Sequence, residues 1–226
     1  MYTDSDMIKA IIFDFGGVLV RTEDASGRRR WEARLGLSDY ELDQLVFNSE
    51  AALRATRGEL PHGAVWEHVA AALKLNAEQL DACQKDFWLG DRLDVDLSAL
   101  LKSLRPGYKT AILSNAWSSG RETIAREFGL EQAVDAIIIS AEEGLAKPDP
   151  RLYRLAAKRL GVQPGEAVMI DDFLVNVEGA RAAGLQAIHY RPGLDVRAEL
   201  EKLGVDTTPP TPSAATSAPA DGDTGV

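Results

Sequence analysis

The sequence has little cysteine and a shortage of positive charge, and each shortage excludes a class of protein. Cys83 is the single cysteine among 226 residues, so the chain can form no internal disulfide and no cysteine cluster for zinc. Lys and Arg number 25 against 35 Asp and Glu, and the formal net charge of −10 disfavours binding to nucleic acid or anionic lipid. We therefore expect small-molecule partners and a reducing compartment, the cytoplasm. Nothing in the sequence predicts the oligomeric state.

Long apolar runs are also lacking. The sequence has no stretch of about 18 consecutive apolar residues, the minimum for a membrane-spanning helix. The apolar segment at 8–20 is interrupted by Lys9 and Asp14, and acidic residues rather than a basic region precede it. We predict no signal peptide and no transmembrane segment.

The residues that are present indicate an α/β fold. Five short, nearly continuous apolar runs are typical of strands buried on both faces of a parallel sheet; they lie at 9–15, 108–115, 135–140, 167–172 and 186–190. Helical patterns at 119–128, 150–160 and 175–183 separate them, with Asp149 as an expected N-cap. The alternation predicts a doubly wound, Rossmann-like parallel sheet.

The interval between the first two predicted strands is too long for a simple crossover. It reads as three helical segments, the first opening at Ser38 with Glu41 as a capping box, the second after Pro61 and the third at Asn76. We predict a small all-helical cap at 21–93, inserted into a core made of 1–20 and 94–206. The final segment, 207–226, has four Pro and no Leu, Ile or aromatic residue, which predicts a disordered tail.

Polar side chains follow three of the predicted strands. Asp14 ends the first strand, Ser114 and Asn115 end the second, and Asp171 and Asp172 end the fourth. In open parallel sheets ligands bind beyond the carboxyl ends of the strands, so these groups should share one rim. Clustered carboxylates repel unless a cation lies among them, and hard oxygen ligands favour Mg²⁺.

Donors for an anion accompany these carboxylates. Lys147 follows the third strand in a loop that Pro148 and Pro150 stiffen, and Gly16 and Gly17 form a turn after Asp14 and Phe15. A lysine, a serine hydroxyl and backbone amides are what a phosphoryl group requires around its oxygens. The combination predicts a phosphate ester as substrate.

Four motifs in order now match a known family: DFGGVL, LSN, AKPDP and IDDFLVNVEGARAAG. Over roughly 8–205 the chain resembles the haloacid dehalogenase-like hydrolases with a small helical cap, in a branch that includes sugar-phosphate phosphatases. The resemblance implies that Asp14 is the nucleophile, that Ser114 binds the phosphoryl oxygens and that Lys147 neutralises charge between them. It also implies substrate contacts from Asn115 and Gly17.

The resemblance implies a magnesium site as well. Its ligands would be the carboxylates of Asp14 and Asp172 and the carbonyl of Gly16, with Asp171 as a supporting carboxylate and Asn176 as a residue behind them. The function implied is Mg²⁺-dependent hydrolysis of a small phosphate monoester through an aspartyl-phosphate intermediate.

Two positions depart from the family pattern. Gly16 replaces the Asp that serves most members as general acid and base, a function worth about 10² to 10⁴ in rate. Its absence predicts slow turnover, a substitute proton carrier or a good leaving group, such as an anomeric sugar phosphate. Phe173 follows the metal carboxylate where a small or polar residue is more common, and we expect it to pack against the cap.

Two other functions remain open. A 2-haloacid dehalogenase uses a similar aspartate without metal, although Asp171 and Asp172 would repel its anionic substrate. A binding domain without turnover would also explain Gly16. Outside the site we expect Arg28, Arg29 and Arg30 to form a solvated helix face, the histidines to be structural, and the tryptophans to pack in cores, with Trp117 nearest the site.

Overall fold

The computed structural model describes residues 7–208 of the 226-residue chain. Five strands form one parallel sheet in the order β5-β4-β1-β6-β7; their bounds are β1 Ala10–Phe13, β4 Lys109–Ser114, β5 Ala136–Ile139, β6 Ala167–Asp171 and β7 Gln186–His189. Each of the five predicted strands is thus present, and the prediction of a parallel α/β sheet is confirmed.

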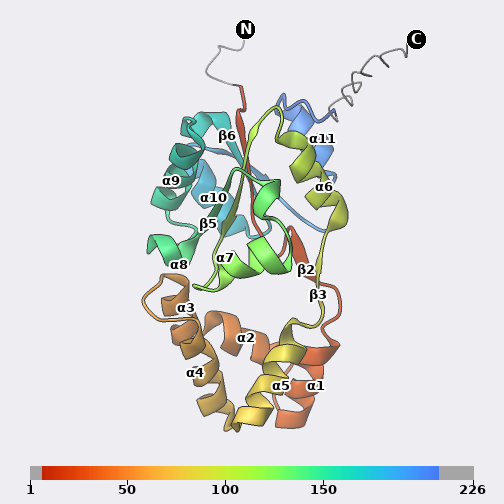
Figure 1. Cartoon of the computed structure of the whole chain (residues 1–226), viewed down its shortest axis with the longest axis vertical. Helices are drawn as coiled ribbons and strands as arrows, with labels where there is room; N and C mark the ends of the chain where they lie inside the picture. The colour runs from red at the N-terminus through yellow and green to blue at the C-terminus, as the bar shows by residue number, and fades with distance from the viewer. Residues whose placement is uncertain (1–6, 209–226) are drawn as a thin grey trace, which may run out of the picture.

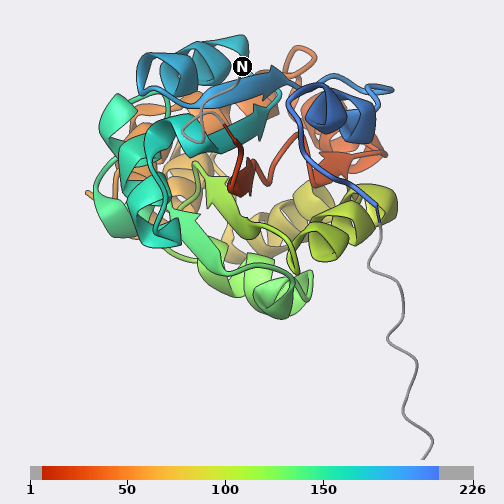
Figure 2. The ribbon, with the colours of Figure 1, turned by 90° about the horizontal axis from the view of Figure 1, so that it is seen from above.

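Helices cover both faces of this sheet (Figure 2). Alternate residues of β1 point to opposite faces, so Ile11 and Phe13 pack in one apolar cluster and Ala10 and Ile12 in the other. The first cluster is closed by α6 (Val95–Leu104) and α11 (Val196–Lys202), and the second by α9 (Pro150–Leu160) and α10 (Leu174–Ala182). Burial on both faces explains why the strand sequences are continuously apolar.

A helical cap lies beyond the carboxyl ends of the strands (Figure 1). It comprises α1 (Ser26–Leu35), α2 (Glu41–Asn48), α3 (Glu50–Thr56), α4 (Gly63–Leu73) and α5 (Ala77–Trp88), which enclose a separate apolar core. The antiparallel strands β2 (Val20–Thr22) and β3 (Asp91–Leu93) carry the chain into and out of the cap. The predicted helical insertion is therefore present.

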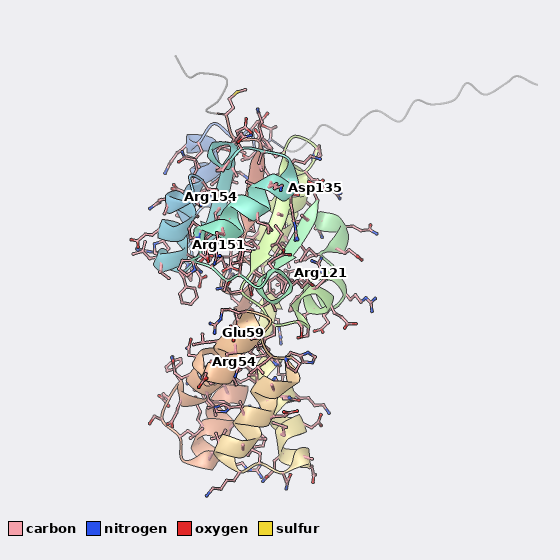
Figure 3. The ribbon with its side chains drawn as sticks, turned by 90° about the vertical axis from the view of Figure 1, so that its left-hand side faces the viewer. Arg54, Glu59, Arg121, Asp135, Arg151 and Arg154 are labelled. Carbon is pink, nitrogen blue, oxygen red and sulfur yellow. The ribbon has the colours of Figure 1, made fainter. Side chains whose placement is uncertain are left out.

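The cap touches the core at a second place, the loop after α3. A Cβ atom on Gly58 would lie 2.1 Å from the Ala141 carbonyl oxygen, so the two backbones approach as closely as glycine allows. Ala141 belongs to α8 (Ser140–Glu143), the short helix after β5. Figure 3 shows the nearby Glu59 and Arg54 at the end of the cap that meets the core.

Several helix ends agree with the sequence and two differ. Asn76 and Asp149 cap α5 and α9 as predicted. The helix expected to open at Ser38 begins only at Glu41, because Tyr40 adopts a left-handed φ of 66°, and Ser49 then interrupts it and caps α3. The predicted helix at 119–128 consists of α7 (Gly120–Glu122) followed by a π-helical turn, Thr123–Glu127.

Two predictions outside the regular elements also need correction. Arg28 is buried rather than solvated, and it binds Asp43 and Asp91. Thr207, which we assigned to the tail, is buried and its hydroxyl donates to Glu201. The rest of the predicted tail, 209–226, lies outside the described residues. Among residues 7–208 no helix is long and apolar enough to cross a membrane.

Candidate active site

Two strand ends bring three acidic side chains together beneath the cap. Asp14 follows β1, Asp171 ends β6, and Asp172 comes next in the chain. One carboxylate oxygen from each lies within 4.8 Å of the others. Since β1 and β6 are adjacent and parallel, their carboxyl ends meet at the same edge, as the sequence predicted.

Lys147 is the cation of this cluster. Its Nζ atom lies 2.7 Å from Asp14 Oδ1 and 2.6 Å from Asp171 Oδ2, and its side chain is 1% exposed. Burial alone would lower the pKa of Lys147, but the two carboxylates more than offset that effect and raise it. The lysine is therefore a fixed positive charge between two acidic residues.

The loop that carries Lys147 is held from both sides. Asn115, after β4, donates its Nδ2 to the Lys147 carbonyl oxygen at 2.9 Å and accepts from the Lys147 N–H at 2.8 Å. The Lys147–Pro148 peptide is cis, and Gly179 of α10 lies against Pro148, where a Cβ would be 2.6 Å from the Pro148 carbonyl oxygen. The expected substrate-binding residue Asn115 thus positions the Lys147 backbone.

The two adjacent carboxylates of the fourth motif differ in their partners. Asp171 accepts from Lys147 and, through Oδ1, from the Phe173 N–H at 2.9 Å and from Asn176 Nδ2 at 3.0 Å. The Oδ1 atom of Asp172 is buried and has no hydrogen-bond partner within residues 7–208. Burial, followed by repulsion from Asp171, raises the pKa of Asp172. The oxygens of Asp171 are therefore engaged in hydrogen bonds within the protein, whereas Asp172 has an oxygen available as a ligand.

Asp14 is nearly enclosed, with 5% exposure. Its Oδ1 accepts from the Phe15 N–H at 2.7 Å, besides its contact with Lys147. Burial raises the pKa of Asp14 to about 7; Lys147 acts against this rise, and the carboxylates of Asp171 and Asp172 add to it. A divalent cation bound beside Asp14 would lower this pKa and stabilise the ionised, nucleophilic form of the carboxylate.

The two glycines after Asp14 differ in what they permit. A Cβ on Gly16 would meet no atom within 4 Å, so this position borders open space. Gly17 has a φ of +85°, and a Cβ there would lie 2.2 Å from Asp172 Oδ2. The N–H of Gly17 donates to the Val20 carbonyl oxygen at 2.8 Å, and Gly17 packs closely against Asp172. Its contact with phosphate stays a prediction.

Ser114 ends β4 at the same rim and is 5% exposed. The chain after it is fixed by a residue that the sequence did not single out, Ser140. The buried Ser140 hydroxyl donates to the Ala116 carbonyl oxygen at 3.1 Å and accepts from the Ala116 N–H at 3.0 Å. Its position at the end of β5, next to β4, was the available signal.

A second unpredicted contact involves His189 at the end of β7. Its Nε2 atom lies 2.9 Å from the Asp172 carbonyl oxygen. The sequence placed this histidine at a strand end without a role; the structure puts it against the backbone of the candidate metal ligand.

The donor set fits a hard divalent cation. Three carboxylates face one ammonium group, so the cluster has surplus negative charge, and the orphaned Asp172 oxygen is a buried acceptor without a donor. The carboxylates of Asp14 and Asp172 would hold Mg²⁺, with the Gly16 carbonyl at the exposed rim as the further predicted ligand. Asp171 is engaged by three donors and is less available than predicted.

Comparison with known proteins gives relatives over most of the chain. D-ribitol-5-phosphate phosphatase of Bacteroides thetaiotaomicron is 27% identical over 215 residues, which cover 86% of this chain and 97% of that protein. The fructose-1-phosphate phosphatase of Escherichia coli is 26% identical and covers 80% of this chain and 95% of its own.

A solved structure agrees in fold. A haloacid dehalogenase family enzyme of B. thetaiotaomicron, crystallised with magnesium and inorganic phosphate, superposes with a TM-score of 0.69 at 20% identity, covering 85% of this chain and 98% of its own. The model of the haloacid dehalogenase-like hydrolase family matches residues 8–184. With its four motifs converging on one rim below a helical cap, this chain belongs to the haloacid dehalogenase-like hydrolases.

Proposed function

We propose that this protein is a Mg²⁺-dependent phosphatase that hydrolyses a small phosphate monoester through a phosphorylated Asp14. The observation that carries the proposal is the buried cluster of Asp14, Asp171 and Asp172 around Lys147, with one Asp172 oxygen left for a metal. The names of the relatives support phosphate esters as substrates.

Two displacements at phosphorus account for the reaction. In the first, an Asp14 carboxylate oxygen bonds to phosphorus while the bond from phosphorus to the ester oxygen breaks, and the leaving oxygen takes a proton from solvent. In the second, water attacks phosphorus and the bond to Asp14 breaks. Phosphate is released, the Asp14 carboxylate is regenerated and the proton of water passes to solvent.

Other residues of the site orient and neutralise these groups. Lys147 holds Asp14 in place through its 2.7 Å contact and presents positive charge to the phosphoryl oxygens. The Ser114 hydroxyl lies at the same rim to donate to one of those oxygens. Bound Mg²⁺ would neutralise negative charge shared by Asp14, Asp172 and the phosphoryl group.

The substrate class follows from the absent carboxylate at position 16. Since no side chain there can protonate the leaving oxygen, the leaving group must be stable as an anion or draw its proton from water. Anomeric sugar phosphates, and likewise aryl and enol phosphates, meet this requirement better than alkyl phosphates do. The relatives are named for D-ribitol 5-phosphate and fructose 1-phosphate, whose phosphates lie on primary alcohols; they support a small sugar phosphate and not the anomeric position.

The decisive assay measures phosphate release with Mg²⁺ or with EDTA, for wild type and Asp14→Asn. The panel contains anomeric and alkyl sugar phosphates, nucleotides and 4-nitrophenyl phosphate. Release that requires Mg²⁺ and is lost in Asp14→Asn supports the proposal. Equal rates on alkyl and anomeric esters would contradict the substrate class alone.

The same assay separates the two alternatives. Gly16 is the observation that favours a binding domain without turnover, and folded protein that binds Mg²⁺ but releases no phosphate would establish it. Halide release from 2-haloacids without metal would instead indicate a dehalogenase.

A further inference from the structure

The cap presents an aromatic surface that contacts the loop following Ser114. Phe47 at the end of α2 and Trp88 at the end of α5 are each 40% exposed, an unusual state for such large apolar rings. Their ring centroids are 5.7 Å apart. Both also contact Trp117, at 6.4 Å and 6.3 Å, so the three rings form one cluster.

Trp117 joins this cluster to the core. It belongs to the loop after β4, three residues beyond Ser114, so its Cα lies within about 11 Å of the Ser114 Cα even in a fully extended chain. Figure 1 shows α2 at the end of the cap nearest the sheet. The aromatic cluster therefore contacts the loop that leaves the phosphate rim, on the side of that loop toward the cap.

Arg28 makes this surface rigid. Its guanidinium lies 4.1 Å from the Phe87 ring centroid and 5.9 Å from those of Phe47 and Trp88. Asp43, Asp91 and the Phe87 carbonyl bind its nitrogens at 2.7–2.9 Å. A surface prepared in this way loses little entropy when a flat group binds to it.

The open position at Gly16 restricts the leaving group independently. No side chain there can supply a proton, so the departing oxygen must be a weak base. The oxygens that leave from aryl and enol phosphates are weak bases, and the groups that carry them are flat and apolar. The oxygens of an open-chain polyol are strong bases, and the polyol is neither flat nor apolar. The chemical requirement and the exposed rings select the same kind of molecule.

We propose that Phe47, Trp88 and Trp117 form the leaving-group subsite, and that the preferred substrates are phosphate monoesters of an aromatic or enolic hydroxyl. The inference rests on the proposed phosphatase activity, because it places the ring beside a phosphate held at Asp14 and Ser114. It differs from a sugar leaving group in requiring contact with a flat apolar face.

Binding of phosphonates tests the subsite without turnover, because their C–P bond is not hydrolysed. Calorimetry with the full chain and Mg²⁺ would compare benzylphosphonate with methylphosphonate, which share the anionic group and differ in the ring. We expect benzylphosphonate to bind about tenfold more tightly, as stacking and apolar burial predict. In Trp88→Leu or Phe47→Leu this preference should fall about three- to tenfold.

Tyr40→Leu is the matched control. Tyr40 is an exposed aromatic residue of the same cap, 65% exposed, whose ring contacts Arg29 instead of the cluster. It should leave the preference unchanged. The Leu variants keep apolar bulk, and melting temperatures near that of wild type would show that they fold.

Three results would overturn the inference: equal affinity for the two phosphonates, a preference that persists in both Leu variants, or an equal loss in Tyr40→Leu. Failure of both phosphonates to bind would be a different result. It would remove the phosphate site itself, and with it the proposed function on which the subsite depends.

Discussion

The core and the cap each bury charged side chains, and Arg28 in the cap differs from Asp172 in the core in whether the protein supplies its hydrogen-bond partners. In the cap, Arg28 binds Asp43 and Asp91, and its Nε donates to the Phe87 carbonyl oxygen. In the core, Lys147 serves both Asp14 and Asp171, and Asp172 keeps a buried oxygen without a donor.

This difference separates structural charge from functional charge. A buried ion with a full set of partners ties elements together, as Arg28 ties α1 to α2 and β3. A buried carboxylate oxygen without a hydrogen-bond donor carries a desolvation cost, and at Asp172 the charge of Lys147 offsets it only in part, since the pKa of Asp172 stays raised. Arg29 and Glu32 of the cap also have buried atoms without a hydrogen bond, but their opposite charges lie 2.9 Å apart. The core cluster, in which the unpartnered oxygen lies among other carboxylates, is therefore the one that calls for a cation from outside.

The largest expected effect is that of Lys147→Met. Two carboxylates lose their shared cation, so we expect phosphate release to fall by about 10² to 10³ or more and the free energy of unfolding in EDTA to fall by about 3–5 kcal/mol. Mg²⁺ should restore part of the stability by neutralising the carboxylates. Phosphate assays and urea unfolding check both, with the exposed Lys158→Met as a control that should match wild type. Full stability in EDTA would contradict this account of the cluster.

Arg28→Met should lower the stability of the protein and leave its Mg²⁺ affinity nearly unchanged. Removing this guanidinium leaves Asp43 with Arg29 and Asp91 with the Thr22 hydroxyl as remaining partners, and we expect the free energy of unfolding to fall by about 3 kcal/mol. Mg²⁺ affinity should stay within about twofold, since the metal site lies in the core. Arg30→Met on the same helix is the matched control, because the Arg30 side chain is 59% exposed. A large loss of Mg²⁺ affinity in Arg28→Met would break the separation between the two clusters.

Gly17→Ala tests the packing of the free carboxylate. The new Cβ would lie 2.2 Å from Asp172 Oδ2 at a φ of +85°, so Asp172 must move, and we expect Mg²⁺ affinity to fall about 10- to 100-fold. The neighbouring Gly16→Ala has open space and should change it little. Magnesium titration of both variants by calorimetry gives the comparison, and equal effects at the two positions would refute it.

The smallest expected effect, at most about tenfold for each pH unit, is a dependence of Mg²⁺ affinity on pH. Because the pKa of Asp14 is raised to about 7, protons compete with the metal below that pH, and apparent affinity should rise up to about tenfold per pH unit and level off above it. Without metal, native Asp14 holds a proton between about pH 4 and 7 that the unfolded chain releases. Stability should therefore decline as pH rises through that window.

Asp14→Asn provides the control for this titration. It removes the ionisable group, so the pH dependence of both affinity and metal-free stability should flatten between about pH 4 and 7. An unchanged slope in Asp14→Asn would assign the titration to another group.

The strands and the rim residues could be predicted from the sequence because their determinants are local. Asp14, Ser114 and Asp171 stand at the carboxyl ends of the apolar runs of β1, β4 and β6. Parallel pairing places the carboxyl ends of neighbouring strands together. The helix caps at Asn76 and Asp149 depend on neighbours within three residues and were also readable.

Partners distant in the chain were not readable. Arg28 reads as a solvated residue until α2 and β3 bring Asp43 and Asp91 to it, and Asn115 reads as a substrate contact until the cis-peptide loop places the Lys147 backbone against it. Asp171 and Asp172 are neighbouring residues of the same type, so the sequence does not distinguish their roles. Their difference lies in which one Lys147 and Asn176 reach.

By itself, the sequence determined which elements form and which side chains stand at the strand ends, since apolar periodicity and capping act over a few residues. The tertiary structure alone decided which of those side chains are satisfied and which are left for a ligand. Hydrogen bonding and desolvation depend on neighbours in space. The residues that supply hydrogen-bond partners to the buried charges of this protein are separated from them by many positions along the chain.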